Sequence, residues 1–446
     1  MNLLDKLVIP LSPEHITLLH YISMLIFFLF VPFISIVLAG TLLSLIYKQK
    51  GTKQNNNFYL RFSKDLIETV TINKSMGIML GIVSLITSVL IYVQLFHSAN
   101  LITVEYLIWS LVFVTIGVIL IYTYRYSSSF SELFNLLDES KESESVAEEI
   151  KKYRIKSRKL SFKAGGFGLA FLLIGTWLFT AGVTLGFFTS KWNDTHVLSV
   201  LFSWAVISRY ITFLLAAAAL TGATILFSFF YWEGGKKNIE EGYKNFVRGS
   251  AIFFTAVPAV ILPIFILLDL TDLPGTTLSG SVFTFLTLGV LLLFLGYHYL
   301  YVMYKNNNAE YSVHIFIVVL FTIFTTIIAD QTAMVNANKQ QTFVLAQNFD
   351  NVMAKLTASS APPTISGEDI YKNICSACHS FDHKVVGPPY KQTLQKYHDD
   401  VDKLVKFILN ATQNNPGYPL MPNPGLTQPQ AHAVATYILK EVKKYE

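Results

Sequence analysis

The chain has two cysteines, Cys375 and Cys378, and a histidine, His379, follows the second one directly. This C-x-x-C-H pattern is typical of covalent c-type haem attachment, since two thiols on one helical turn can each bond a vinyl group of the porphyrin. The adjacent imidazole is then placed to bind the iron. A redox-active cysteine pair would normally lie beside a βαβ pattern, which the sequence lacks, and a zinc site would need two further ligands at a fitting spacing. We therefore predict one covalent haem c.

A second axial ligand is available downstream. Met421 lies in the loop G-Y-P-L-M-P-N-P at 417–424, and no other methionine follows the cysteine motif. Methionine opposite histidine is common in electron-transfer cytochromes, where it raises the reduction potential. We predict His379 and Met421 as the iron ligands; the alternative is a methionine that merely fills the core of the loop.

Around these ligands, residues of about 365–446 resemble the small class I bacterial cytochromes c of the c551/c552 type. The matching features are Gly367, Tyr371, Cys375, Lys384, the run G-P-P-Y at 387–390, Met421-Pro422 and the closing helix A-T-Y-I-L at 435–439. The resemblance implies that the backbone carbonyl of Pro388 accepts a hydrogen bond from the second ring nitrogen of His379 and so fixes the ring. It also implies that the first and last helices of the domain cross through Gly367, Tyr371 and Tyr437.

The rest of the chain has the composition of a membrane protein. The whole sequence is 52% hydrophobic and 14% charged, with a mean hydropathy of +0.46. Apolar runs long enough to cross the hydrocarbon core predict about eight transmembrane helices. We place them at about 17–46, 75–97, 101–124, 164–189, 203–232, 249–269, 279–304 and 311–334. The stretch 195–232 exceeds one span, and a short interfacial helix containing His196 would account for the excess.

The predicted fold is thus all-α, a polytopic membrane helix bundle with a C-terminal periplasmic class I cytochrome c domain. We divide the chain into a transmembrane domain at 1–334, a periplasmic helix and linker at 335–364, and the cytochrome c domain at 365–446. Within the linker, 331–355 reads as a helix that leaves the membrane, and 357–364, T-A-S-S-A-P-P-T, as a tether.

The distribution of charge predicts the topology. Lysine and arginine gather in the first, third and fifth loops, most densely in the run K-K-Y-R-I-K-S-R-K at 151–159, whereas the loops between them are nearly bare. Positive-inside counting places the charged loops in the cytoplasm and both termini outside. Acidic residues at 142–149 beside the basic run suggest a solvated charged helix in the third loop. We therefore expect a multi-pass protein of the bacterial inner membrane whose haem domain is periplasmic, on the face where c-type haem is attached.

The membrane part also resembles, more weakly, the catalytic subunit of the cytochrome bd quinol oxidases. The segments that match are L-I-F-F-L-F-V-P at 25–32 and F-L-L-A-A-A-A-L-T-G-A at 213–223. That family has haem-ligating histidines at the positions of Phe27 and Phe213. The family's glutamate in the second span, its long quinol loop and its G-W-x-x-x-E-x-G-R-Q-P-W motif have no counterpart. The resemblance therefore implies a bd-like scaffold without b haems, and chance similarity of apolar helices is the alternative.

Histidines and charges inside or near the spans offer few further sites. His298 and His314 lie on consecutive predicted spans near one turn and could pair only at a shallow depth, so we do not expect haem b. Arg209 is the main polar candidate, because ionisable residues within spans are commonly functional. It could face a quinone headgroup, a haem propionate or an acidic partner such as Asp269 or Asp330, or it could extend to the outer interface.

Two classes of function fit these features. The first is a membrane-anchored monohaem c-type cytochrome that transfers electrons at the periplasmic face, as a subunit of a bd-like respiratory oxidoreductase complex and not as a complete enzyme. Its expected partners are membrane lipid, subunits with additional redox centres and a periplasmic electron donor or acceptor, with quinone as a further candidate and no nucleic acid. The second is a non-redox transporter or sensor with an appended haem c reporter domain.

Overall fold

The protein is built from helices arranged in two units. The computed structural model describes residues 9–71, 73–97, 99, 101–136, 144–192, 197–235, 239–360, 366–397, 400–411 and 417–445. Within these ranges the regular structure is entirely helical, which confirms the all-α class. Contacts divide the chain into units Met1–Asp350 and Asn351–Glu446. The finer division at 334 and 364 stays a prediction.

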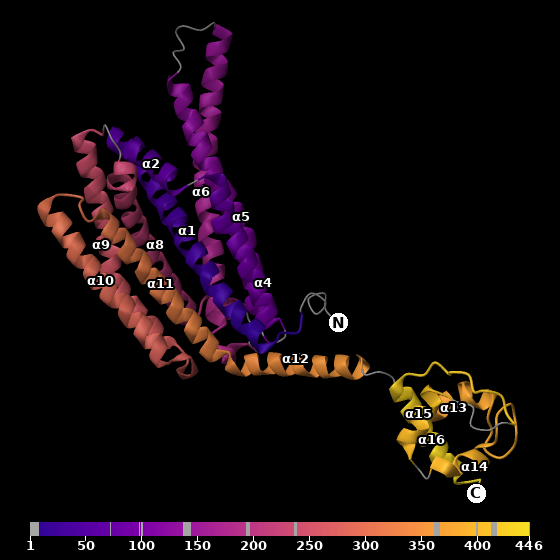
Figure 1. Ribbon diagram of the computed structural model, residues 1–446. Coiled ribbons are helices and arrows are strands. Elements are labelled where there is room, and N and C mark those ends of the chain that lie inside the picture. Colours follow the sequence, from indigo (N-terminus) through magenta and orange to yellow (C-terminus); the bar gives the residue numbers. More distant parts are fainter. Residues whose placement is uncertain are drawn as a thin grey trace. The chain divides into compact units, whose positions relative to one another are not determined.

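Among the described residues of the first unit, eight helices are long and apolar enough to cross a membrane, as predicted. They pack side by side as a bundle (Figure 1). In chain order they are α1 (Pro13–Gln54), the segment from α3 (Lys74–Gly77) through a π-helical stretch (Ile78–Val83) to α4 (Ser84–Phe96), α5 (Leu101–Leu136), α6 (Glu144–Leu185), α8 (Trp204–Phe230), α9 (Glu241–Asp272), α10 (Gly280–Asn306) and α11 (Ser312–Ala337).

The predicted first and third loops are mostly helical. α1 continues to Gln54, and the rest of the first loop forms α2 (Asn57–Val70), whose Phe62 and Leu66 are buried. α5 and α6 extend past the other helices as a hairpin (Figure 1). Polar residues without proline can stay helical in water, so the third loop prolongs α5 and α6. The first loop prolongs α1 only as far as Gln54, because Asn55 takes a left-handed conformation, with a φ of 51°, and ends the helix. The predicted charged helix is therefore the start of α6, with residues 137–143 outside the described part.

Two boundaries in the connecting segments differ from prediction. The helix predicted over 331–355 is divided at Asn338, where α11 ends and α12 (Lys339–Ser360) begins. The tether predicted from Thr357 is still helical up to Ser360, because the first proline comes only at Pro362 and nothing before it breaks the helix. Residues 361–364 lie outside the described residues, as does His196, although a short helix, α7 (Val197–Leu201), does precede α8.

The second unit surrounds a small apolar core. Its elements are α13 (Gly367–Asn373), the 3-10 turn η7 (Cys375–Ala377), α14 (Tyr390–Thr393), η8 (Gln395–Tyr397), α15 (Val401–Leu409) and α16 (Gln428–Val442). α16 presents Ala431, Val434, Ala435 and Ile438 to this core, at the spacing of one helical face.

The first and last helices of this unit pack closely. A Cβ on Gly367 would overlap the backbone carbonyl of Ala433, so only glycine permits the approach. Beside it, the rings of Tyr371 and Tyr437 lie 5.8 Å apart between centroids. The crossing uses the three residues that the sequence resemblance named, and it fixes the start of the cysteine-bearing turn against the core.

Candidate functional site

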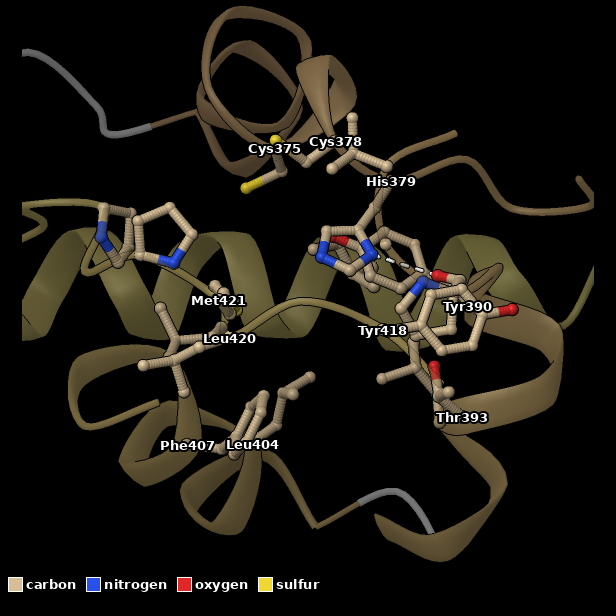
Figure 2. A pocket seen from close by; sticks show the side chains of 18 of the residues that line it. Cys375, Cys378, His379, Tyr390, Thr393, Leu404, Phe407, Tyr418, Leu420 and Met421 are labelled. Atoms are coloured by element: carbon tan, nitrogen blue, oxygen red, sulfur yellow. Dashed lines mark hydrogen bonds between the residues drawn. The ribbon is translucent and has the colours of Figure 1, made fainter. Parts of the chain in front are cut away.

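One turn of backbone carries both cysteines and the histidine. α13 begins at an N-cap in which the Ser366 hydroxyl accepts a hydrogen bond from the amide of Asp369, 3.2 Å away. After this helix, the amides of Cys378 and His379 both donate to the carbonyl of Cys375, at 3.1 and 2.9 Å. The tight turn directs the three side chains to one side of the backbone (Figure 2). The short spacing of the motif in the sequence therefore places the two thiols and the imidazole close together in the structure.

These side chains line a cavity of about 230 Å³. Met421 lies on the same cavity, beside Leu420 (Figure 2). The remaining walls are chiefly apolar and come from every part of the unit: Ile374, Val386, Leu394, Leu404, Phe407, Ile408, Pro419, Pro422 and Ile438. An apolar cavity with a few convergent polar groups suits a planar hydrophobic cofactor.

The orientation of the His379 ring is fixed by its neighbours. Its Nδ1 lies 3.0 Å from the backbone oxygen of Pro388. A dashed line beside the His379 ring marks this hydrogen bond in Figure 2. Because a carbonyl can only accept, Nδ1 carries the proton and Nε2 keeps its lone pair. A Cβ on Gly387 would overlap the ring, so the Gly-Pro step lets the backbone pass close beneath it. The free nitrogen is therefore the one that can bind a metal.

Tyr390 has a role that the sequence did not reveal. Its ring stacks on that of His379, with centroids 5.1 Å apart and planes 10° from parallel. Burial raises the pKa of the Cys375 thiol, partly offset by a hydrogen bond with Tyr390, and burial also raises the pKa of Tyr390 well above its usual range. Both groups are therefore protonated at neutral pH. An aromatic residue directly after the Gly-Pro-Pro run was the only signal for this contact.

The loop that carries Met421 is restrained on both sides. Prolines at 419, 422 and 424 limit its backbone, and Gly425 takes a positive φ of 69° while its amide donates to the side chain of Asn423 at 2.9 Å. Earlier in the loop, the Tyr418 ring lies under the Lys384 ammonium, 4.7 Å from its centroid. These restraints present a thioether at the cavity.

Two thiols, an imidazole with a free Nε2, a thioether and apolar walls are the groups that a covalently attached, six-coordinate haem requires. The residues present fit that group. Carried by a multi-pass helical bundle, they define a membrane protein with a c-type cytochrome domain.

Comparison with known proteins agrees that the C-terminal unit is a c-type cytochrome domain. Residues 365–441 match the model of the cytochrome c family. Cytochrome c-551 of Azotobacter vinelandii is 34% identical over 79 residues, which are 17% of this chain and 95% of that protein. Cytochrome c-551 of Stutzerimonas stutzeri is 37% identical over 78 residues, 16% of this chain and 74% of the relative. Its namesake in Allochromatium vinosum is 35% identical over 72 residues, 15% of this chain and 77% of the relative.

The chain belongs, through its C-terminal part, to the cytochrome c family, which implies covalently bound haem c and a role in electron transfer. No solved structure matches the chain. The family match begins at residue 365, so the resemblance of the membrane helices to the bd oxidases stays a prediction.

In the membrane part, the two phenylalanines that the sequence resemblance aligns with the bd oxidase ligands line a common cavity. Phe27 and Phe213 both line a second cavity, within the helical bundle. The Phe27 ring packs edge-on against Phe179, with centroids 5.4 Å apart, and Phe213 stacks on Tyr210 at 6.1 Å. Neither side chain has a lone pair with which to bind iron.

The structure also places the polar candidates of the membrane part. Arg209 lies 3.2 Å from Asp330, a pairing that the sequence could not choose over Asp269 or the outer interface. His298 and His314 both lie against Tyr299, at centroid distances of 6.1 and 5.4 Å.

Proposed function

We propose that this protein is a membrane-anchored monohaem c-type cytochrome that transfers electrons at the periplasmic face of a bacterial inner membrane. We further propose that it acts as a subunit of a bd-like respiratory oxidoreductase complex. The observation that carries the proposal is the convergence of Cys375, Cys378, His379 and Met421 on one cavity, in a chain whose described residues include eight helices apolar enough to span a membrane.

Each residue has a distinct task in this proposal. Cys375 and Cys378 would hold the porphyrin covalently, while His379 Nε2 and the Met421 sulfur would bind the iron. The Pro388 carbonyl keeps the His379 ring in one orientation and one tautomer, 3.0 Å from Nδ1. Bound haem c supplies a one-electron couple. The protein supplies its position and, through Met421, a raised potential.

The cofactor assignment is tested by haem counting on the purified chain. A pyridine haemochrome spectrum should show one haem c and no haem b. Replacing both cysteines by alanine should abolish covalent haem staining. In Met421→Leu, the thioether-to-iron band at the red edge of the spectrum should vanish. The potential should also fall by more than about 59 mV, a tenfold change in a one-electron equilibrium.

Met353→Leu is the matched control, because Met353 is exposed on α12 and does not line the cavity. It should keep both the band and the potential. A Met421→Leu protein with an unchanged band would refute the ligand assignment.

The proposed complex rests on the two side chains at the positions that the resemblance aligns with the b-haem ligands of the bd oxidases. With phenylalanine at 27 and 213, the remaining redox centres must lie in a companion subunit. Gentle solubilisation should therefore recover the 50.2 kDa chain in a larger assembly, and the isolated chain should not turn over quinol with oxygen. A b-type spectrum, or such turnover by the chain alone, would contradict the proposal.

A further inference from the structure

The helix that follows the last span begins at a turn fixed by hydrogen bonds. α11 ends at Ala337, and Asn338, which is 3% exposed, follows in a non-helical conformation. Its side-chain amide donates to the carbonyl of Gly186 at 3.0 Å, just beyond the end of α6. Two residues earlier, the side-chain amide of Asn336 donates to the carbonyl of Thr277, 3.1 Å away. The direction in which α12 leaves α11 is therefore set by the ends of neighbouring spans (Figure 1).

The start of α12 lies at one boundary of the membrane-spanning bundle. Asp330, near the end of α11, pairs with Arg209, near the start of α8, so these two helix ends meet. α1 also begins at this end, because neighbouring spans alternate in direction. Near the starts of α8 and α1, Trp204 is 55% exposed and Tyr21 is 66% exposed. Tryptophan and tyrosine gather at the level of the lipid headgroups, so α12 begins at that level.

An apolar stripe runs along one face of α12. Leu345, Phe349, Val352 and Leu356 follow one another at intervals of four, three and four residues, the spacing of one helical face. Leu345 is buried in the core of the bundle, whereas Val352 and Leu356 are 37% and 58% exposed. Because Leu345 packs on the bundle, the stripe lies on the side of α12 that faces the membrane.

The opposite face of α12 is polar and carries little charge. Gln347 and Asn351 lie there, and both are exposed. The charged residues of the whole helix are Lys339, Asp350 and Lys355. Two exposed apolar residues lie off the stripe near the start of the helix, Phe343 and Val344. The stripe alone continues into the second half of α12.

That second half needs stabilisation from outside the helix. Every residue from Asn351 to Thr357 is exposed. A helical segment of this length is only marginally stable in water by itself, since helices depend on the burial of an apolar face. Burial of the stripe would therefore stabilise the segment.

We propose that α12 lies on the surface of the phospholipid bilayer, at the end of the bundle where α11 ends. Phe349, Val352 and Leu356 would lie at the boundary between headgroups and acyl chains, with Gln347 and Asn351 in water. Lipid is the occupant because the stripe begins against the spans, at headgroup level, and continues from there. Since the helix carries little charge, apolar burial drives the contact, and zwitterionic and anionic phospholipids should serve alike. The contact goes beyond the proposed electron-transfer function, since it involves no haem.

Photocrosslinking of the full chain in nanodiscs tests the two faces separately. Val352→p-benzoyl-phenylalanine should form phospholipid adducts, identified by mass spectrometry, in nanodiscs of phosphatidylcholine and of phosphatidylglycerol. The matched control, Asn351→p-benzoyl-phenylalanine, is the neighbouring position on the polar face and should lose these adducts. Equal lipid adducts at both positions, or none at Val352, would overturn the proposal. So would a protein adduct at Val352 in place of lipid, which would make the stripe a protein-docking surface.

Amide hydrogen exchange in the same nanodiscs gives an independent measurement. Val352→Asp places a charge within the stripe and should speed exchange across the second half of α12. Asn351→Asp places the same charge on the polar face and should leave exchange as in the wild type. Valine, asparagine and aspartate have similar helix propensities, so propensity does not separate the two variants. Equal exchange in both would overturn the proposal, whereas a chain without haem c that passes both tests would overturn only the proposed function.

Discussion

His379 is positioned by contacts on three sides of its ring. The Pro388 carbonyl fixes Nδ1, Tyr390 stacks on one face, and the backbone at Gly387 passes beside the ring. Each neighbour is within eleven positions of the histidine, so one short segment both carries the ligating side chain and orients it. A hydrogen bond that orients a histidine ligand also raises its basicity, and its loss typically lowers the affinity for the metal.

Gly387→Ala should therefore disturb the site without removing a ligand. The added methyl group overlaps the His379 ring, and relief requires the ring or the backbone to move. Overpacking of this kind costs about 1–3 kcal/mol. We expect a lower melting temperature of the haem domain and an altered reduction potential.

Gly417→Ala is the control for this prediction, because a Cβ there meets nothing within 4 Å. The two variants differ only in the surroundings of the added methyl group. Equal melting curves and potentials for both would show that the Gly387 contact does not constrain the histidine.

At the scale of elements, the crossing of α13 and α16 holds the cysteine-bearing turn against the domain core. Tyr371 packs on Phe381 as well as on Tyr437, with ring centroids 4.9 Å apart in the first pair. The contact joins residues at opposite ends of the domain sequence. Its loss should therefore loosen the whole haem cavity.

Gly367→Ala should destabilise the cytochrome domain by about 1–3 kcal/mol, because its methyl group would overlap a backbone carbonyl that cannot rotate away. Unfolding followed by haem absorbance in guanidinium chloride measures the change. Glu368→Ala, at the neighbouring exposed position, removes a surface ion pair with Lys372 and should leave the midpoint unchanged. If both variants unfold at the same guanidinium chloride concentration, the close approach of α13 and α16 does not determine the stability of the domain.

Across the whole membrane unit, an even number of spans returns the chain to the side from which it began. The basic run at 151–159 lies on the α5–α6 hairpin, at the end of the bundle opposite the start of α1 (Figure 1). Arg209, near the start of α8, lies at the other end. The positive-inside rule therefore predicts that the hairpin is cytoplasmic.

Cysteine labelling checks this topology. A membrane-impermeant maleimide applied outside intact spheroplasts should label Ala99→Cys but not Tyr153→Cys. Tyr153 is 53% exposed on the hairpin, so the lack of labelling would not reflect burial. Tyr153→Cys should react once the membrane is permeabilised. The reverse pattern would invert the orientation and place the haem domain in the cytoplasm.

Local sequence determined much of this protein. Cys375, Cys378 and His379 lie within one turn of the backbone. Their side chains therefore come together wherever that turn folds, and the haem-attachment motif can be recognised without knowledge of the rest of the fold. Apolar runs of sufficient length specify spans because their backbone must satisfy its own hydrogen bonds in lipid. The lysines and arginines of the intervening loops predict which side of the membrane each loop occupies, because only the residues near the ends of the spans count.

Tertiary structure decided what depends on helix rotation and crossing. Arg209, Asp269 and Asp330 come from three spans, and the sequence could not state which carboxylate Arg209 meets. Likewise, Phe27 and Phe213 share one cavity although 186 positions separate them. Uniformly apolar helices show little preference for one face, so their rotation is set by packing against neighbours and not by a pattern that can be read along the chain.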